Sequence, residues 1–221
     1  MPGNGHGVTL RVWGEWACFT RPELKVERYS YDVMTPSAAR GILEAILWKP
    51  AIRWCVEWID VLAPVQWGSI RRNEVGKKAV APASSLVKSG GNAALGLFVE
   101  DERQQRSATV LRNVDYVVHA RFTMTQEAGP EDSPAKFVEM ARRRIDKGQC
   151  FHRPYLGCRE FAASFGPAPM EYKPCAESRD LGFMLYDMNY GVNPATPRFF
   201  RARMEGGRVC IPRPDSPEVL G

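Results

Sequence analysis

Histidine is scarce in this sequence, and several signals for cofactors, membranes and secretion are missing from it. There are 3 histidines in 221 residues, and the 6 cysteines form no CxxC pair. No apolar run approaches the roughly 18–20 residues of a membrane span, and residues 1–8 lack a signal-peptide pattern. No glycine-rich phosphate-binding motif follows a predicted strand, and no Asp-x-Asp pair stands at a strand end. We therefore expect a cytoplasmic protein with no membrane association, no disulfide framework and no cofactor.

One cluster of residues suggests a metal site. Cys150, His152 and Cys158 stand in the spacing C-x-H-x5-C. Zinc sites usually have tighter pairs and a second pair further along the chain, and none follows here. Ordinary buried thiols are the simpler interpretation, so we expect no metal.

Positive charge is modest overall but clustered. The chain has 30 Lys+Arg against 25 Asp+Glu, a formal net charge of +5. Two arginine-rich segments, residues 142–159 and 198–213, also carry aromatic residues. Arginine with aromatic rings suits phosphate contacts and base stacking on single-stranded nucleic acid. A solvated helix face and a charged tail would give the same composition, so both interpretations stand.

The hydrophobic periodicity predicts four strands and two helices. The strands are expected over residues 8–13, 52–58, 110–125 and 158–165. The helices are expected to begin at Thr35 and Ser133, because each can cap a helix and precedes a proline suited to the first turn. They are expected to end near Lys49 and Gly148, where Pro50 stops the first and a glycine stops the second.

This order of elements indicates an α+β fold. It is the βαββαβ order of a ferredoxin-like (RRM-like) domain, in which two helices cover one face of an antiparallel sheet. The other face would then be free to bind RNA. We expect residues 1–165 to form this domain, with 68–107 as a long inserted basic hairpin and loop. Residues 166–221 are rich in Pro, Gly and Arg and are expected to form a small β-rich C-terminal domain.

Four segments are distinctive enough to suggest a family. They are ERYSYDVMTPSAARGILEAILWKPAIRW (27–54), SIRRNEV (69–75), QRSATVLRNVDYVVHARF (105–122) and GQCFHRPYLGCREFAASF (148–165). They resemble CRISPR-associated RAMP proteins, and more narrowly the Cas-five type of the subtype I-C (Dvulg) system. The resemblance implies a nuclease that cuts the repeat hairpins of precursor CRISPR RNA. It also implies that the protein stays on the 5′ handle of the product, with other subunits of the interference complex.

The resemblance further implies a metal-independent reaction. The 2′-hydroxyl beside the scissile phosphate attacks it, which leaves a 2′,3′-cyclic phosphate and a 5′-hydroxyl. Such a reaction needs a base, an acid and positive charge on the phosphate.

Candidate catalytic residues follow from the resemblance and from residue chemistry. Family members use a tyrosine at the end of the first helix, a position that Leu47 occupies here. Tyr29 and Tyr31, just before that helix, could take its place, although packing would explain them as well. His119 suits proton transfer near neutral pH, and it faces away from the apolar side of its strand. Arg121, two residues further along the same side, suits phosphate contact.

Candidate RNA-binding residues lie in the insertion, near the helix ends and in a Gly- and Pro-flanked loop. They are Lys49, Arg71, Arg72, Lys77, Lys78, Arg143, Arg144, Lys147, His152 and Arg153. Because RNA helices are recognised mainly through shape and phosphates, several cations without fixed geometry suffice.

Three functions remain open at this point. The first is the metal-independent nuclease, and the second is a non-catalytic RNA-binding scaffold of the same complex, which Leu47 favours. The third is a metal-dependent nuclease that acts on DNA as well. Cleavage in the presence of a chelator, and the chemistry of the product ends, distinguish them.

Overall fold

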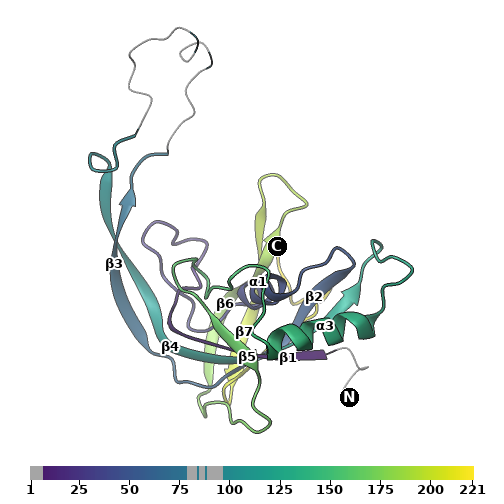
Figure 1. Ribbon diagram of the computed structural model, residues 1–221. Coiled ribbons are helices and arrows are strands. Elements are labelled where there is room, and N and C mark those ends of the chain that lie inside the picture. The colour runs from purple at the N-terminus through teal and green to yellow at the C-terminus, as the bar shows by residue number, and fades with distance from the viewer. Residues whose placement is uncertain (1–6, 79–83, 85–87, 89–96) are drawn as a thin grey trace.

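One long antiparallel sheet forms the body of the protein (Figure 1), in a computed structural model that describes residues 7–78, 84, 88 and 97–221. The elements in chain order are β1 (Gly7–Ala17), α1 (Pro36–Ile46), β2 (Ile52–Val61), β3 (Trp67–Val75), β4 (Arg103–Met124), α3 (Pro134–Asp146), β5 (Ser164–Pro167), β6 (Arg179–Asn189), β7 (Thr196–Glu205) and β8 (Arg208–Cys210). The strands are ordered β5-β1-β4-β2-β8-β7-β6, and β3 pairs with β4 outside this path. The predicted α+β class is confirmed. No described helix is long and apolar enough to cross a membrane.

Both helices begin at their predicted caps. The Thr35 side chain accepts a hydrogen bond from the Ala38 amide, and the Ser133 side chain accepts one from the Lys136 amide. Their apolar stripes face the same side of the sheet, where they pack in one core with alternate residues of β1, β2 and β4. Side chains of the opposite parity therefore point to the other side, which we call the distal face.

A β-bulge changes the face on which β2 presents its side chains. Trp54 and Val56 lie on the helix side, as their alternation predicts. The register of β2 against β4 shifts between Val56 and Trp58, so Trp58 pairs with His119 and Ile59 takes the buried position. A bulge adds one residue to one strand and reverses the faces beyond it. Trp58 therefore lies on the distal face, contrary to the simple alternation.

The predicted insertion begins as a hairpin arm that extends from the sheet (Figure 1). β3 pairs in antiparallel register with residues 103–111 of β4. The predicted loop falls largely on residues 79–83, 85–87 and 89–96, which lie outside the described residues. β4 has 22 residues, and at about 3.4 Å per residue it spans roughly 70 Å from the arm into the core.

The fourth predicted strand is displaced along the chain. β5 covers Ser164–Pro167, whereas residues 158–163 form turns and a bridge. Local hydrogen bonds explain the displacement: the Phe161 amide donates to the Cys158 carbonyl, and the Ala163 amide donates to the Pro154 carbonyl. These bonds close residues 154–163 into a turn, so the strand begins only after it.

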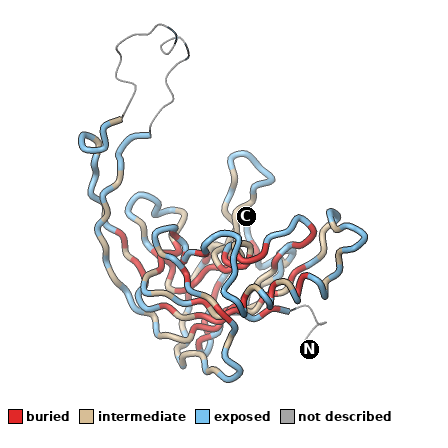
Figure 2. Tube along the Cα trace, viewed as in Figure 1, coloured by how far each residue is buried: buried red, intermediate tan, exposed pale blue. Residues whose placement is uncertain are grey.

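The C-terminal strands continue the same sheet. β8 pairs with β2 on one side and with β7 on the other. Buried residues of β6, β7 and β8, including Met184, Phe200 and Val209, belong to the same core cluster as those of β1 and α1. Figure 2 shows the buried segments running through the body of the protein. The two predicted units, 1–165 and 166–221, therefore share one sheet.

Candidate active site on the distal face

His119 lies near the middle of the distal face, between its strand partners Thr9 on β1 and Trp58 on β2. The Trp58 ring stacks on the imidazole, with centroids 4.3 Å apart and planes at 19°. Only 17% of the His119 side chain is exposed. The residue thus faces away from the helices, as predicted, but in a covered position.

A fully buried carboxylate stands beside His119. Asp60 is 0% exposed, and its Oδ2 lies 3.2 Å from His119 Nε2. Arg208 on β8 donates to both carboxylate oxygens, from Nε to Oδ1 at 2.6 Å and from Nη2 to Oδ2 at 3.0 Å. Burial would raise the pKa of Asp60, but hydrogen bonds from Arg208 and Tyr172 lower it below its usual value. The carboxylate therefore stays charged at neutral pH.

Tyr172 joins the two groups. Its hydroxyl lies 2.8 Å from Asp60 Oδ2 and 2.6 Å from His119 Nε2. Burial and the hydrogen bond to Asp60 raise the pKa of Tyr172 to about 12, so the phenol keeps its proton. A hydroxyl has one proton to donate, and the carboxylate is the stronger acceptor. We therefore assign the second contact as His119 Nε2–H donating to the Tyr172 oxygen.

This assignment leaves His119 Nδ1 without a proton, 3.4 Å from the Thr9 hydroxyl. Burial lowers the pKa of His119 below its ordinary value of 6.5, although the Asp60 carboxylate acts in the opposite direction. The ring is therefore neutral at pH 7, with Nδ1 as its basic nitrogen. The Asp60 carboxylate beside Nε2 favours this tautomer and would stabilise the imidazolium that forms when Nδ1 takes a proton. This is the arrangement of a general base.

Arg121 follows His119 on the same face of β4. Its side chain is 40% exposed, and Nε lies 3.3 Å from Glu57 Oε1. A cavity of about 240 Å³ beside it is lined by Trp58, Arg121 and Arg213, among others. A guanidinium in this position can contact a phosphate near the imidazole.

The predicted tyrosines lie away from His119. Tyr29 bridges to Thr109 of β4, ten residues from His119, which is on the order of 30 Å along an extended strand. Tyr31 is buried, and burial raises its pKa. Leu47 is fully buried in the core on the helix side of the sheet. The structure therefore brings none of these three residues to the His119 site.

Several predicted RNA-binding residues gather where the two helices end. Lys49, Arg143, Lys147, His152 and Arg153 are exposed there, and we call them the helix-end patch. The Phe151 and His152 amides donate to the Ala45 carbonyl, which fixes the loop on the end of α1. Arg144 instead donates to the Ile46 carbonyl at 2.5 Å, so its charge caps α1.

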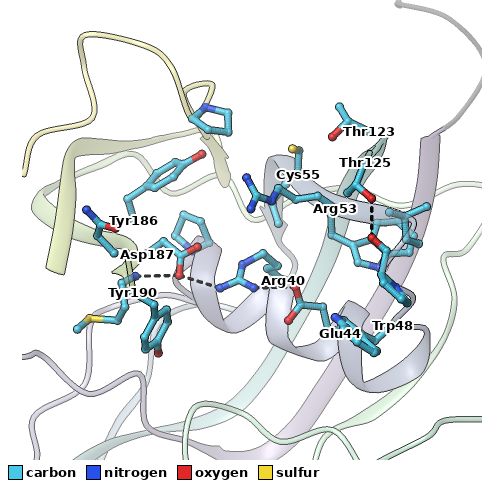
Figure 3. Close-up of a pocket in the computed structure, with 18 of the residues that line it drawn as sticks. Arg40, Glu44, Trp48, Arg53, Cys55, Thr123, Thr125, Tyr186, Asp187 and Tyr190 are labelled. Carbon is cyan, nitrogen blue, oxygen red and sulfur yellow. Dashed lines mark hydrogen bonds and ion pairs between the residues drawn. The ribbon is translucent and has the colours of Figure 1, made fainter. Parts of the chain in front are cut away.

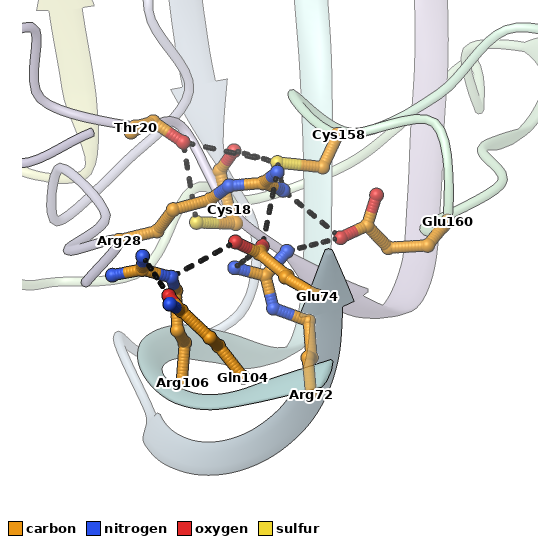
Figure 4. A network of polar contacts seen from close by, with 9 residues as sticks. All are labelled: Cys18, Thr20, Arg28, Arg72, Glu74, Gln104, Arg106, Cys158 and Glu160. Carbon is orange, nitrogen blue, oxygen red and sulfur yellow. Dashed lines mark hydrogen bonds and ion pairs between the residues drawn. The ribbon is translucent and has the colours of Figure 1, made fainter. Parts of the chain in front are cut away.

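The predicted cations of the arm divide into two kinds. Arg71 and Lys78 are exposed. Lys77 pairs with Glu102, and Arg72, 16% exposed, pairs with both Glu74 and Glu160. Figure 4 shows Arg28, Arg72 and Arg106 converging on the acidic side chains of this network. Arg72 therefore ties the arm to the loop before β5, and its charge is already balanced.

The cysteine and histidine spacing does not form a cluster. Cys158 is buried, with Arg28 Nη1 3.3 Å from its sulfur, whereas Cys150 and His152 are exposed. Across the described parts of the chain, no group of three His, Cys, Asp or Glu side chains is placed to hold a metal.

Sequence reasoning missed Asp60, Tyr172 and Arg208. One signal was present, because Asp60 is a carboxylate within the apolar run Trp58-Ile59-Asp60-Val61-Leu62. Buried carboxylates need partners and are often functional. Tyr172 and Arg208 carried no comparable signal.

Comparison with known proteins agrees with these observations. A family model for CRISPR-associated proteins (Cas_Cas5), of the Cas5d type, matches residues 7–211. The "CRISPR pre-crRNA endoribonuclease Cas5d" of Mannheimia succiniciproducens is 48% identical over 213 residues, 93% of this chain and 94% of that protein. The protein of the same name from Thermus thermophilus is 44% identical over 223 residues, 93% and 91% of the two chains.

Solved structures show the same fold at lower identity. One described as "Crystal Structure of CRISPR-associated Protein" has a TM-score of 0.71 and 22% identity, over 97% of this chain and 96% of that one. The Streptococcus mutans protein SMU1763c, described as functionally uncharacterized, has a TM-score of 0.69 and 21% identity, over 97% of both chains. The match of the family model over most of the sequence, with two relatives above 40% identity, is decisive: the chain belongs to the Cas5d family of CRISPR-associated proteins.

Proposed function

We propose that this protein is an endoribonuclease that cuts precursor CRISPR RNA within the repeat. It then remains on the 5′ handle of the product, as a subunit of the type I-C interference complex. The names of its two relatives support the RNA substrate. The pairing of His119 with the buried Asp60 carboxylate is the observation that carries the proposal.

We also propose that a ferredoxin-like core presents this site. The strand order β5-β1-β4-β2, with α1 and α3 on one side, supports a ferredoxin-like core. Residues 166–221 then form a β-rich extension of that core. Its distal face is the RNA-binding face.

Cleavage in this proposal proceeds without a metal ion. His119 Nδ1 takes the proton of the 2′-hydroxyl, and the resulting imidazolium is stabilised by Asp60. The 2′-oxygen forms a bond to the adjacent phosphorus, and the bond to the 5′-oxygen breaks. The products are a 2′,3′-cyclic phosphate and a 5′-hydroxyl, whose proton comes from solvent. Arg121 balances the charge on the phosphate oxygens.

The exposed cations hold the remainder of the RNA. The helix-end patch offers four full positive charges and an imidazole around the loop that caps α1. Such a group attracts the phosphate backbone without reading the sequence. Arg71 and Lys78 offer further charge on the arm.

A scaffold without nuclease activity is the second candidate. Leu47 favours it, because the position where family members carry a tyrosine holds a side chain that transfers no proton. In that case the same surfaces bind the RNA, and another protein cuts it.

The test uses 5′-labelled repeat RNA from the source organism, excess EDTA and protein at pH 6 to 9. The wild type is compared with His119→Ala, and with Phe183→Ala as a control at an exposed ring on β6 that belongs to no proposed catalytic or RNA-binding group. One cut with a cyclic phosphate end, lost only in His119→Ala, supports the proposal. Tight binding without a cut supports the scaffold. Cutting that requires a divalent cation, or that extends to DNA, supports a metal-dependent nuclease instead.

A further inference from the structure

A large cleft separates α1 and the beginning of β2 from the β6–β7 hairpin (Figure 3). Its volume is about 1270 Å³, which exceeds the roughly 300–1,000 Å³ of pockets for drug-sized ligands. It is thus large enough for an extended ligand of several units. Apart from Lys49, none of its lining residues has a role in the function proposed above.

An ion-pair network holds the two walls of the cleft together. Arg40 on α1 donates to Glu44 at 2.7 Å and, across the cleft, to Asp187 on β6 at 2.8 Å. Figure 3 shows Arg40 between these two carboxylates. The charges of these three side chains are therefore balanced by one another, and the Arg40–Asp187 contact links the two walls.

Two aromatic rings stand exposed at the cleft. Trp48, just beyond α1, is 59% exposed, and Tyr190, at the end of β6, is 77% exposed. They lie on opposite sides in Figure 3. Exposed rings of this size contribute little to the core, but their faces can each stack on a base.

Cations also line the cleft. Lys49 and Arg53 are exposed, and Arg198 is half-buried beside Tyr186. Glu127 is the exposed acidic residue of the same lining. Exposed positive charge with stacking rings matches the backbone and bases of a single strand.

The cleft continues toward the proposed cleavage site. It shares Cys55, Val56, Ile211 and Pro214 with the 240 Å³ cavity that Arg121 and Trp58 line. Arg121 and Trp58 both adjoin His119 on the distal face. A strand that passes His119 therefore has an adjoining path into the cleft.

We propose that this cleft binds the unpaired RNA that flanks the repeat hairpin, with bases stacked on Trp48 and Tyr190 and phosphates on Lys49, Arg53 and Arg198. The inference rests on the proposed function in that RNA is the ligand. It assigns to Trp48 and Tyr190 the part of the affinity that depends on unpaired nucleotides.

Two labelled RNAs test the proposal. One is the repeat hairpin alone, and the other is the same hairpin with eight unpaired nucleotides on each side. Fluorescence anisotropy gives their affinities for the wild type, the double variant Trp48→Ala/Tyr190→Ala, and the matched control Phe183→Ala, an exposed ring on β6 outside the cleft lining. Each lost base stack weakens binding by roughly 5- to 160-fold.

We expect the double variant to lose at least tenfold in affinity for the flanked RNA and less than twofold for the bare hairpin. Phe183→Ala should bind both RNAs like the wild type. In the wild type, 4-thiouridine in the flank should crosslink to peptides that contain Trp48 or Tyr190. This measurement uses the wild-type protein alone, so it does not depend on whether the variants fold. Equal losses for both RNAs, or crosslinks confined to other peptides, would overturn the proposal and leave a protein partner as the occupant.

The outcomes separate this inference from the proposed function. Wild-type protein that binds the flank through Trp48 and Tyr190 but cuts nothing would refute the nuclease and retain the cleft. A protein that cuts normally in the double variant, with unchanged affinity for the flanked RNA, would refute only the cleft.

Discussion

Replacing Asp60 with asparagine keeps the size of the side chain but removes the charge that faces His119. Asp60 Oδ2 lies 3.2 Å from Nε2, and the side chain is fully buried. The imidazolium that forms during proton transfer would then lose its counter-charge. The amide can also donate a hydrogen bond to Nε2, which moves the imidazole proton to Nδ1 and removes the base. Both effects slow cleavage.

The size of the first effect follows from the distance. Two unit charges 3.2 Å apart interact by about 1.3 kcal/mol at the dielectric constant of water and by about 5 kcal/mol at an effective value of 20. Because 1.36 kcal/mol is tenfold in rate, Asp60→Asn should slow cleavage by roughly 10-fold to several thousand-fold.

Single-turnover cleavage of 5′-labelled repeat RNA in EDTA measures this loss. Asp115→Asn is the matched control, because Asp115 lies four residues away on the same face of β4 and pairs with Arg11 at 2.7 Å. The control should stay within about threefold of the wild type. Urea unfolding verifies that both variants are folded. Equal losses in the two variants, or wild-type cleavage in Asp60→Asn, would refute the role of Asp60.

Three further predictions test other parts of the structure. Because burial lowers the pKa of His119, cleavage at subsaturating RNA should fall in acid with an apparent pKa below 6.5; a midpoint above 6.5 would contradict a buried neutral base. Arg144→Ala should lower the free energy of unfolding by about 1–2 kcal/mol in urea, since it removes the charged hydrogen bond to the Ile46 carbonyl at the end of α1. Exposed Arg143→Ala should change this free energy by no more than about 0.5 kcal/mol and weaken RNA binding instead. Gly157→Ala should destabilise the protein by about 2 kcal/mol or more, because φ is 84° and a Cβ would overlap the Cys18 carbonyl; a wild-type melting curve would refute this packing.

Local signals made the helices predictable. Thr35 and Ser133, each followed by proline, cap helices whose first residues are Pro36 and Pro134. The parity of β4 also placed His119 on the side away from the helices. These features depend on residues close together in sequence, so they can be predicted without knowledge of the tertiary structure.

The surroundings of His119 were not predictable in the same way. The bulge after Val56 moves Trp58 to the distal face, and a bulge leaves no mark in an alternating pattern. Arg208 reaches Asp60 from 148 positions further along the chain, and Tyr172 reaches it across 112. Tertiary packing alone brings these groups together.

The Asp60–Arg208 pair also constrains the order in which the chain can mature on the ribosome. β2 is synthesised well before β8, its neighbour in the sheet, because Arg208 follows Asp60 by 148 positions. Until β8 is synthesised, one edge of β2 stays unpaired, and the Asp60 carboxylate lacks the cation that offsets the free-energy cost of burying its charge. The Asp60–Arg208 pair beside His119 therefore cannot form until β8 has emerged. A ribosome-bound fragment that stops before Arg208 should remain sensitive to proteases, and it should lack the site that would act on RNA.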